Sequence, residues 1–160
     1  MSYSLIVSHD INRGISKNGK IPWNLPDYDR YFKRTILNKS ILAGRKTWDN
    51  LCNKPIQYKP NIVLSRTKTD IPGAVIFTNI VGALNYIAFE DGIIIGGREL
   101  YKIAVKDPLC KTLYITKIYE DFECDIKFPE ISRTAFTIVN KKISEKYGVY
   151  HEFLTYIRND

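Results

Sequence analysis

The sequence predicts an α/β fold with a mostly parallel central sheet, helices on both faces and an antiparallel hairpin at the C-terminus. Through most of the chain, short apolar segments rich in Ile, Val, Tyr and Phe alternate with helical segments, as in parallel sheets whose strands are joined by helices. Only a polar loop separates the last two apolar segments, which indicates an antiparallel hairpin at one edge. At 160 residues the chain can bury one full core, so we expect residues 1–160 to form a single domain.

The individual elements follow from apolar periodicity and from turn signals. Strands are expected where β-branched and aromatic residues cluster: Tyr3–Ser8, Ser40–Ala43, Asn61–Ser65, Ala74–Phe77, Gly92–Ile95 and Lys111–Ile118. Helices are expected between them: Asp27–Leu37, Arg45–Asn50, Ile80–Phe89 and Arg98–Lys106. Pro26 suits the first turn of the first helix, Asn24 is a candidate cap, and Asn38-Lys39 and Gly92 provide stop signals. The hairpin strands are expected at Ala135–Asn140 and Tyr150–Ile157.

Composition excludes several classes of protein. The chain is 44% hydrophobic and 26% charged, an ordinary balance for a globular domain. No apolar run approaches membrane-spanning length, and the first strand lacks the basic flank of a signal peptide, so we expect a cytoplasmic protein. The cysteines Cys52, Cys110 and Cys124 are odd in number and form no C-x-x-C motif, which argues against a disulfide framework and against a metal site.

The net charge of +7 raises the question of a nucleic-acid partner. The Lys and Arg residues are spread along the chain without a basic run or an aromatic RNA-binding motif, which favours a solvated basic surface and no nucleic-acid partner. This positive surface charge would still attract the phosphates and carboxylates of small ligands.

Three segments are suited to binding phosphate. Gly44-Arg45-Lys46-Thr47-Trp48 follows a strand and opens a helix, where backbone amides can face a diphosphate. Leu64-Ser65-Arg66 ends the next strand with a hydroxyl and a guanidinium, which can bind a phosphate monoester. Ile93 to Leu100, read as I-I-I-G-G-R-E-L, is again strand, glycine turn and helix, although it lacks the G-x-G-x-x-G spacing of the usual dinucleotide fingerprint.

Taken in order, these segments resemble the dihydrofolate reductase family over nearly the whole chain. The resemblance also includes G-I-S-K-N-G-K-I-P-W from Gly14 to Trp23, N-I-V-L-S-R up to Arg66, L-Y-I-T-K-I from Leu113 to Ile118, and F-E-C-D-I-K-F-P from Phe122 to Pro129. It implies a dihydrofolate-reductase-like fold that transfers a hydride from NADPH to 7,8-dihydrofolate, giving tetrahydrofolate, with a place in one-carbon metabolism.

The resemblance also implies an NADPH site. In it, Arg45 and Arg66 would hold the 2′-phosphate, while Thr47, Ser65 and the backbone of Gly97 to Leu100 would hold the diphosphate. The full set of implied cofactor residues is Ser8, Ile15, Gly44, Arg45, Lys46, Thr47, Leu64, Ser65, Arg66, Gly96, Gly97, Arg98, Glu99 and Leu100. The family's cis peptide would lie between Gly96 and Gly97, and the segment Asn12–Ile21 resembles the loop that closes over the nicotinamide.

The implied substrate side departs from the family's pattern. Ile6, Phe32, Leu51, Ile95, Tyr101 and Thr116 match pocket positions, and Trp23 matches a catalytic one. Lys59 stands where the family has an Arg that forks onto the folate tail, so charge is kept but the planar fork is lost.

The family's buried acid is missing. Counting from Trp23–Pro26 and from Phe32–Arg34 places Tyr28 at its position. Asp29, three residues before Phe32, is a candidate substitute, and the alternative is a solvated helix charge. Asp27 is expected in the solvated first turn, rotated off the Tyr28 face.

Two other functions stay open beside dihydrofolate reductase. The chain could reduce another pteridine or a pyrimidine with NADPH, or it could bind NADPH without catalysis. His9 and His151 have no partner nearby in the sequence, so both are expected on the surface or in the hairpin. We expect a monomer that binds a small-molecule substrate, without membrane or metal.

Overall fold

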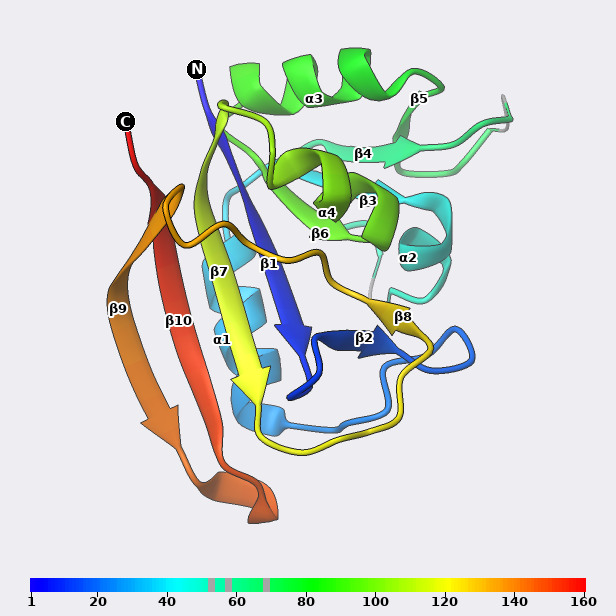
Figure 1. The fold of residues 1–160 in the computed structure, drawn as a ribbon. Helices are drawn as coiled ribbons and strands as arrows, with labels where there is room; N and C mark the ends of the chain where they lie inside the picture. The colour runs from blue at the N-terminus through cyan, green and yellow to red at the C-terminus, as the bar shows by residue number, and fades with distance from the viewer. Residues whose placement is uncertain (52–53, 57–58, 68–69) are drawn as a thin grey trace.

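A computed structural model describes residues 1–51, 54–56, 59–67 and 70–160 of the chain, so Cys52 lies outside the described residues. Its centre is an eight-stranded sheet with the order β5-β4-β3-β6-β1-β7-β10-β9 (Figure 1). The strands of this sheet are β1 (Tyr3–His9), β3 (Ile41–Gly44), β4 (Asn61–Leu64), β5 (Val75–Phe77), β6 (Ile93–Gly96), β7 (Cys110–Ile118), β9 (Phe136–Ser144) and β10 (His151–Arg158).

The pairing confirms the predicted mixture of parallel and antiparallel strands. From β5 through β7 every neighbouring pair is parallel, with β1 held between β6 and β7. β10 then runs antiparallel to β7, and β9 runs antiparallel to β10 at the sheet edge. The C-terminal ends of the parallel strands therefore lie along one side of the sheet, where ligands of open α/β sheets bind.

Helices cover both faces of the sheet, as the sequence predicts. One face packs α3 (Ile80–Phe89) and α4 (Arg98–Ala104) over a cluster that includes Leu5 and Val7 of β1. The other packs α1 (Pro26–Ile36) and α2 (Arg45–Asp49) over a cluster that includes Ile6. Side chains alternate between the two faces along a strand, so Ile6 and Ser8 of β1 face the side on which α1 lies.

The structure differs from the predicted elements in three places. A small second sheet joins β2 (Gly14–Ser16) to β8 (Ile126–Lys127), and neither strand was expected. The edge strand β9 runs to Ser144 and is followed by a 3-10 turn, η1 (Lys146–Gly148). The residue that caps α1 is Leu25, with no side-chain hydrogen bond, so the predicted cap at Asn24 is wrong.

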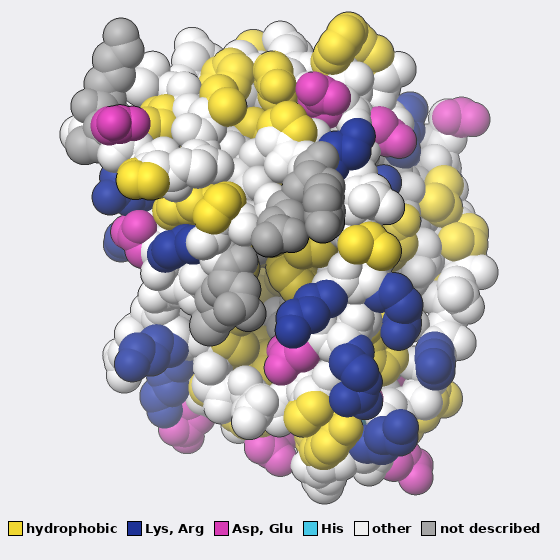
Figure 2. Space-filling view, turned by 180° about the vertical axis from the view of Figure 1, so that it is seen from behind, with side chains coloured by type: hydrophobic (Ala, Val, Ile, Leu, Met, Phe, Trp, Pro, Cys, Tyr) yellow, Lys and Arg dark blue, Asp and Glu magenta, His cyan; other side chains and the backbone are white. Residues whose placement is uncertain are grey.

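The surface mixes charges of both signs with apolar groups. Figure 2 shows Lys and Arg side chains spread over one face, with acidic and hydrophobic side chains between them. Among the described residues, no group of His, Cys, Asp and Glu could hold a metal ion. None of the helices in the described part of the chain is both long and apolar enough to cross a membrane.

Candidate functional site

Three neighbouring parallel strands end together and bring the predicted phosphate-binding segments side by side. In the register, Gly44 of β3 pairs with Leu64 of β4, and Ala43 of β3 pairs with Gly96 of β6. Ser65-Arg66, Gly44–Thr47 and Gly96–Arg98 therefore lie at adjacent strand ends. Arg45 and Arg98 begin α2 and α4, whose first backbone amides point away from the sheet.

Gly96 and Gly97 allow the backbones of this region to approach closely. The peptide between them is cis, as the resemblance implied, and Gly96 has a φ of 143°. A Cβ at Gly96 would lie 2.9 Å from Oγ1 of Thr47, and one at Gly97 would lie 3.2 Å from the same atom. A larger residue would therefore displace Thr47, and glycine also tolerates the positive φ. Leu100 is buried beneath this turn.

Arg45 and Arg66 at these strand ends are exposed, and each is paired with a carboxylate. Arg45 Nε lies 3.1 Å from Asp49 Oδ1, and Arg66 Nη2 lies 3.1 Å from Glu99 Oε2. Exposed pairs of this kind contribute little to stability, so a phosphate can compete for either guanidinium. Lys46 and Arg98 are exposed in the same region, whereas Ser65 is buried and its Oγ donates to Thr67 O at 3.0 Å.

A second group of side chains gathers where β1 and β7 end beside the start of α1. Ser8 of β1 pairs in register with Thr116 of β7, so both hydroxyls lie on the α1 face. Trp23 Nε1 donates to Ser8 Oγ at 3.1 Å. Thr116 Oγ1 is buried and has no hydrogen-bond partner among the described residues. Such a group carries a desolvation cost that a ligand could relieve.

Tyr28 lies beside these hydroxyls. Burial raises the pKa of its phenol, an effect that hydrogen bonding to Ser8 only partly opposes. The phenol is therefore neutral at physiological pH and can exchange hydrogen bonds but cannot supply a negative charge. Burial raises the pKa of Tyr101 as well, and the neighbouring Tyr28 adds to this effect. Tyr101 donates its hydroxyl to Ile6 O at 2.7 Å.

Apolar side chains surround this group. Ile6 and Ile95 belong to the buried cluster beneath α1, and the partly buried Phe32 and Leu51 pack against it. The rings of Tyr28 and Phe32 are 6.2 Å apart between centroids, which agrees with their predicted common helix face. Lys59 is exposed.

The three candidate positions at the start of α1 have different surroundings. Asp29 is exposed, whereas Tyr28 is half-buried and Asp27 is largely buried, with 11% of its side chain exposed. Asp27 binds His151 of β10 and Ser144 of β9, so the prediction that Asp27 is solvated is wrong. His9 is buried in β1, so its predicted placement on the surface or in the hairpin is wrong, whereas His151 does lie in the hairpin and is buried there. No local signal identified the Asp27–His151 pair because 124 residues separate its partners.

The segment Asn12–Ile21 is anchored at its base. Asp10 accepts hydrogen bonds from the backbone amides of Asn12, Gly14 and Phe122. β2 then pairs with β8, and Ile15 packs against the cluster beneath α3 and α4. The part beyond this anchor turns through a bridge between Lys17 and Lys20.

Two surface hollows lie apart from these groups. One, of about 480 Å³, is lined by Glu99, Lys102, Ile103, Lys106 and Asp107 along α4. The other, of about 170 Å³, opens near His9, Arg13 and Lys117. Their linings lack the convergent glycine turns and hydroxyls of the strand ends, so we place the candidate site at the strand ends.

Comparison with known proteins gives a consistent result. The family model described as dihydrofolate reductase matches residues 2–158. The dihydrofolate reductase of Bacillus subtilis (strain 168) is 33% identical over 158 residues, which cover 96% of this chain and 92% of that protein. That of Heliothis virescens is also 33% identical over 158 residues, covering 87% of this chain and 85% of that protein.

Longer relatives and a solved structure extend the comparison. The bifunctional dihydrofolate reductase-thymidylate synthase of Daucus carota is 30% identical over 187 residues, covering 98% of this chain. The chain spans only 34% of that protein. The dihydrofolate reductase from Enterococcus faecalis, solved in complex with NADP(H) and RAB-propyl, superimposes with a TM-score of 0.87 at 30% identity, covering 99% of this chain and 97% of that one.

Proposed function

Since the chain belongs to the dihydrofolate reductase family, we propose that it transfers a hydride from NADPH to 7,8-dihydrofolate, giving tetrahydrofolate. The observation that carries this proposal is the arrangement of two groups on one fold. Glycine turns and exposed guanidiniums lie at the ends of β3, β4 and β6, while hydroxyls and aromatic rings lie at the ends of β1 and β7 beside α1.

The first group fits NADPH. Bound NADPH would supply the hydride, and this chain's residues would bind and orient the cofactor. The close approach of Gly96 and Gly97 to Thr47 leaves backbone amides free of bulky side chains, which suits a diphosphate. Arg45 and Arg66 are exposed, and each can turn from its carboxylate to the 2′-phosphate of NADPH.

The second group fits a neutral pteridine ring. We assign the ring to the region between Phe32 and the hydroxyls of Ser8, Tyr28 and Thr116. Thr116 Oγ1 lacks a partner among the described residues, so an amino group of the ring can donate a hydrogen bond to it without displacing a protein group. Trp23 orients Ser8, and Lys59 would attract the tail carboxylates as a point charge.

The missing acid shapes the proposed mechanism. Hydride transfer to dihydrofolate requires a proton at a ring nitrogen, and the neutral Tyr28 phenol cannot form the ion pair that would stabilise this protonated ring. Asp29 is exposed, which favours Tyr28 over Asp29 as the residue that contacts the ring. We therefore propose that solvent supplies the proton and that turnover is slow at neutral pH, because a positioned donor typically contributes about 10²- to 10⁴-fold in rate.

The test is NADPH oxidation with dihydrofolate, compared with a panel of other pteridines and pyrimidines. Turnover with dihydrofolate, and tetrahydrofolate as the product, would support the proposal. Turnover with another ring alone would instead identify a reductase of that compound. NADPH binding without oxidation of any substrate would identify a non-catalytic cofactor-binding protein.

We further propose that residues 1–160 act as one domain and as a cytoplasmic monomer. The free thiols of Cys110 and Cys124 are compatible with a reducing compartment. Sedimentation of the purified chain tests the monomer, since a dimer would double the mass.

A further inference from the structure

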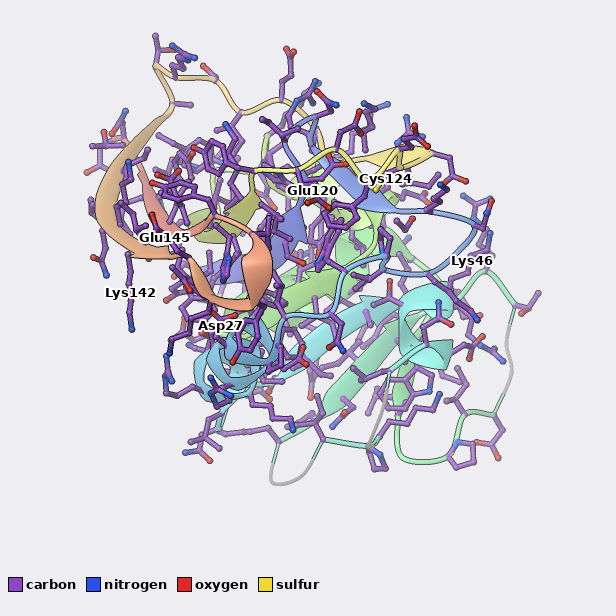
Figure 3. All side chains as sticks on the ribbon, turned by 90° about the horizontal axis from the view of Figure 1, so that it is seen from below. Asp27, Lys46, Glu120, Cys124, Lys142 and Glu145 are labelled. Carbon is purple, nitrogen blue, oxygen red and sulfur yellow. The ribbon has the colours of Figure 1, made fainter. Side chains whose placement is uncertain are left out.

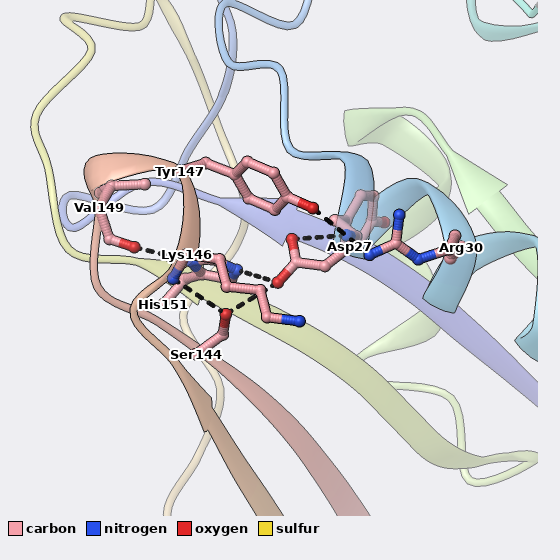
Figure 4. Close-up of polar contacts among 8 residues, drawn as sticks. Asp27, Arg30, Ser144, Lys146, Tyr147, Val149 and His151 are labelled. Carbon is pink, nitrogen blue, oxygen red and sulfur yellow. Dashed lines mark hydrogen bonds and ion pairs between the residues drawn. The ribbon is translucent and has the colours of Figure 1, made fainter.

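A buried ion pair joins the first turn of α1 to β10, the last strand in chain order. His151 Nε2 lies 2.7 Å from Asp27 Oδ2, and Ser144 Oγ donates to the same oxygen at 2.9 Å (Figure 4). The His151 side chain is fully buried, and only 11% of the Asp27 side chain is exposed. Figure 3 shows Asp27 beside the turn between β9 and β10, well apart from Lys46 of α2.

Hydrogen-bond acceptors face both ring nitrogens of His151. Burial would raise the pKa of Asp27, but hydrogen bonds from His151 and Ser144 outweigh burial and hold that pKa below its ordinary value. The carboxylate is therefore ionised and only accepts. His151 Nδ1 lies 2.9 Å from Val149 O, a carbonyl that also only accepts. Both ring nitrogens of His151 therefore lie within hydrogen-bonding distance of an oxygen that accepts.

The same carboxylate also fixes the backbone of Tyr28. The Tyr28 amide donates to Asp27 Oδ1 at 2.9 Å, while Leu25 supplies no side-chain cap. Asp27 therefore stabilises the start of α1 both by this bond and through the helix dipole. The contact with His151 Nε2 in turn fixes the carboxylate. A second link nearby, from Arg30 Nη2 to Tyr147 OH at 3.4 Å, is exposed and cannot hold the turn as firmly.

We propose that Asp27 and His151 are positioning residues for the reduction, holding the first turn of α1 so that the Tyr28 phenol stays beside Ser8. The inference rests on the proposed function and adds to it two residues that touch neither ring nor cofactor. A buried ion pair is weak evidence for stability alone, since an apolar pair of similar volume often stabilises as well. A positioning role is favoured because the Asp27 carboxylate that binds His151 also accepts a hydrogen bond from the Tyr28 amide.

A double-mutant cycle tests whether the pair acts through Tyr28. We compare the KM for dihydrofolate in the native chain, Asp27→Asn, Tyr28→Phe and the double variant. Asp27→Asn should raise KM about fivefold or more in the native background and less than about twofold in the Tyr28→Phe background, because residues of one network are not additive. The NADPH dissociation constant should stay constant throughout.

The matched control is Glu152→Gln. Glu152 is the neighbour of His151 on β10, is buried, and forms an ion pair with Lys141 at 2.8 Å on the opposite side of the strand. The Glu152→Gln substitution should lower the stability of the fold without changing the KM for dihydrofolate. Equal effects of Asp27→Asn in both Tyr28 backgrounds, or an equal KM increase in Glu152→Gln, would overturn the inference and leave the proposed function intact.

A spectroscopic measurement decides the inference without catalysis. The indole N–H of Trp23 bonds to Ser8 beside Tyr28, so its proton resonance should shift in His151→Gln and not in Glu152→Gln. The His151→Gln variant also serves if Asp27→Asn does not fold. An unshifted indole resonance in His151→Gln overturns the inference. Absence of turnover in the native chain refutes the proposed function, and the indole resonance still tests the positioning.

Discussion

Ser8 and Thr116 are register partners on neighbouring strands, yet their hydroxyls differ in hydrogen bonding. Trp23 donates to Ser8, whereas Thr116 Oγ1 is buried without a partner among the described residues. Removing an unpartnered buried hydroxyl does not lose a protein hydrogen bond, so any role of Thr116 in binding can be separated from a role in folding.

Thr116→Val should therefore weaken substrate binding without weakening the fold. We expect KM for dihydrofolate to rise about fivefold, the value of roughly one hydrogen bond, and the free energy of unfolding to stay equal or increase by up to about 1 kcal/mol. Steady-state kinetics and urea unfolding provide the two values. Ser40→Ala is the control, since Ser40 Oγ is also buried and unpartnered in the described chain but lies at the other end of β3. An unchanged KM in Thr116→Val would remove this residue from the site.

Restoring a carboxylate at Tyr28 should restore activity at neutral pH. The native rate should increase as pH falls, because protonation of the ring then becomes easier, while Tyr28→Asp should raise the neutral rate by about 10²-fold or more. The check is the pH–rate profile of both proteins with Asp29→Asn beside them. A fast, pH-independent native rate that is lost in Asp29→Asn would transfer the acid's role to Asp29.

Diaminopyrimidine antifolates should inhibit the native chain weakly. Such rings bind the family as cations paired with the acid, and the raised pKa of Tyr28 leaves no charge to pair with them. A buried ion pair with hydrogen bonds to a charged group is worth about 1.5–3 kcal/mol per bond, so Tyr28→Asp should tighten inhibition at least about tenfold. Inhibition constants for the two proteins provide the test, and nanomolar inhibition of the native chain would contradict it.

The chain should prefer NADPH to NADH by at least about tenfold, because Arg45 and Arg66 can each form charge-assisted bonds to the 2′-phosphate. Arg66→Ala should narrow this difference, because it weakens the binding of NADPH but not that of NADH. Fluorescence titration measures both dissociation constants, with Lys106→Ala as a basic control at the far end of α4. Equal affinities in the native chain would remove the basis for Arg45 and Arg66 as phosphate ligands.

The Asp10 carboxylate should make the free energy of unfolding fall at acid pH. Burial would raise the pKa of Asp10, but amides of Gly14, Phe122 and Asn12 outweigh burial and lower it. A lowered pKa stabilises the fold above the unfolded value of about 3.9 and loses this effect as pH falls through the folded value. Asp10→Asn should cost about 1–3 kcal/mol at neutral pH and flatten the acid dependence. Urea unfolding at neutral pH and at acid pH measures this effect. The control is Asp121→Asn, which removes an exposed carboxylate and should change the free energy of unfolding little at either pH.

The sequence predicted the main elements because their signals are local. Apolar runs and glycine turns identified the parallel strands and the segments at Gly44, Ser65 and Gly96 to within one or two residues. β2 and β8 are too short for an alternating pattern, and Asp10 brings their segments together by accepting hydrogen bonds from the amides of Gly14 and Phe122. The polar half of β9 resembles a loop because both of its faces are largely exposed.

The candidate site was predictable only where residues contact ligands in the family. Tyr28 and Thr116 were identified by register with known motifs. Asp27 and His151 could not be paired from the sequence, since the start of α1 and the distant strand β10 meet only in the folded protein. Asn24 failed as a cap because the helix begins one residue later, at Pro26.

The position of β1 also determines when this chain can fold. β1 is paired on both sides by strands that are synthesised much later, β6 at Ile93–Gly96 and β7 at Cys110–Ile118. A nascent chain shorter than this leaves the apolar residues of β1 without their native neighbours, and such non-local pairing is slow to form. Assembly of the sheet around β1 is therefore a late event, and β1 stays exposed and prone to aggregation until β6 and β7 have been synthesised.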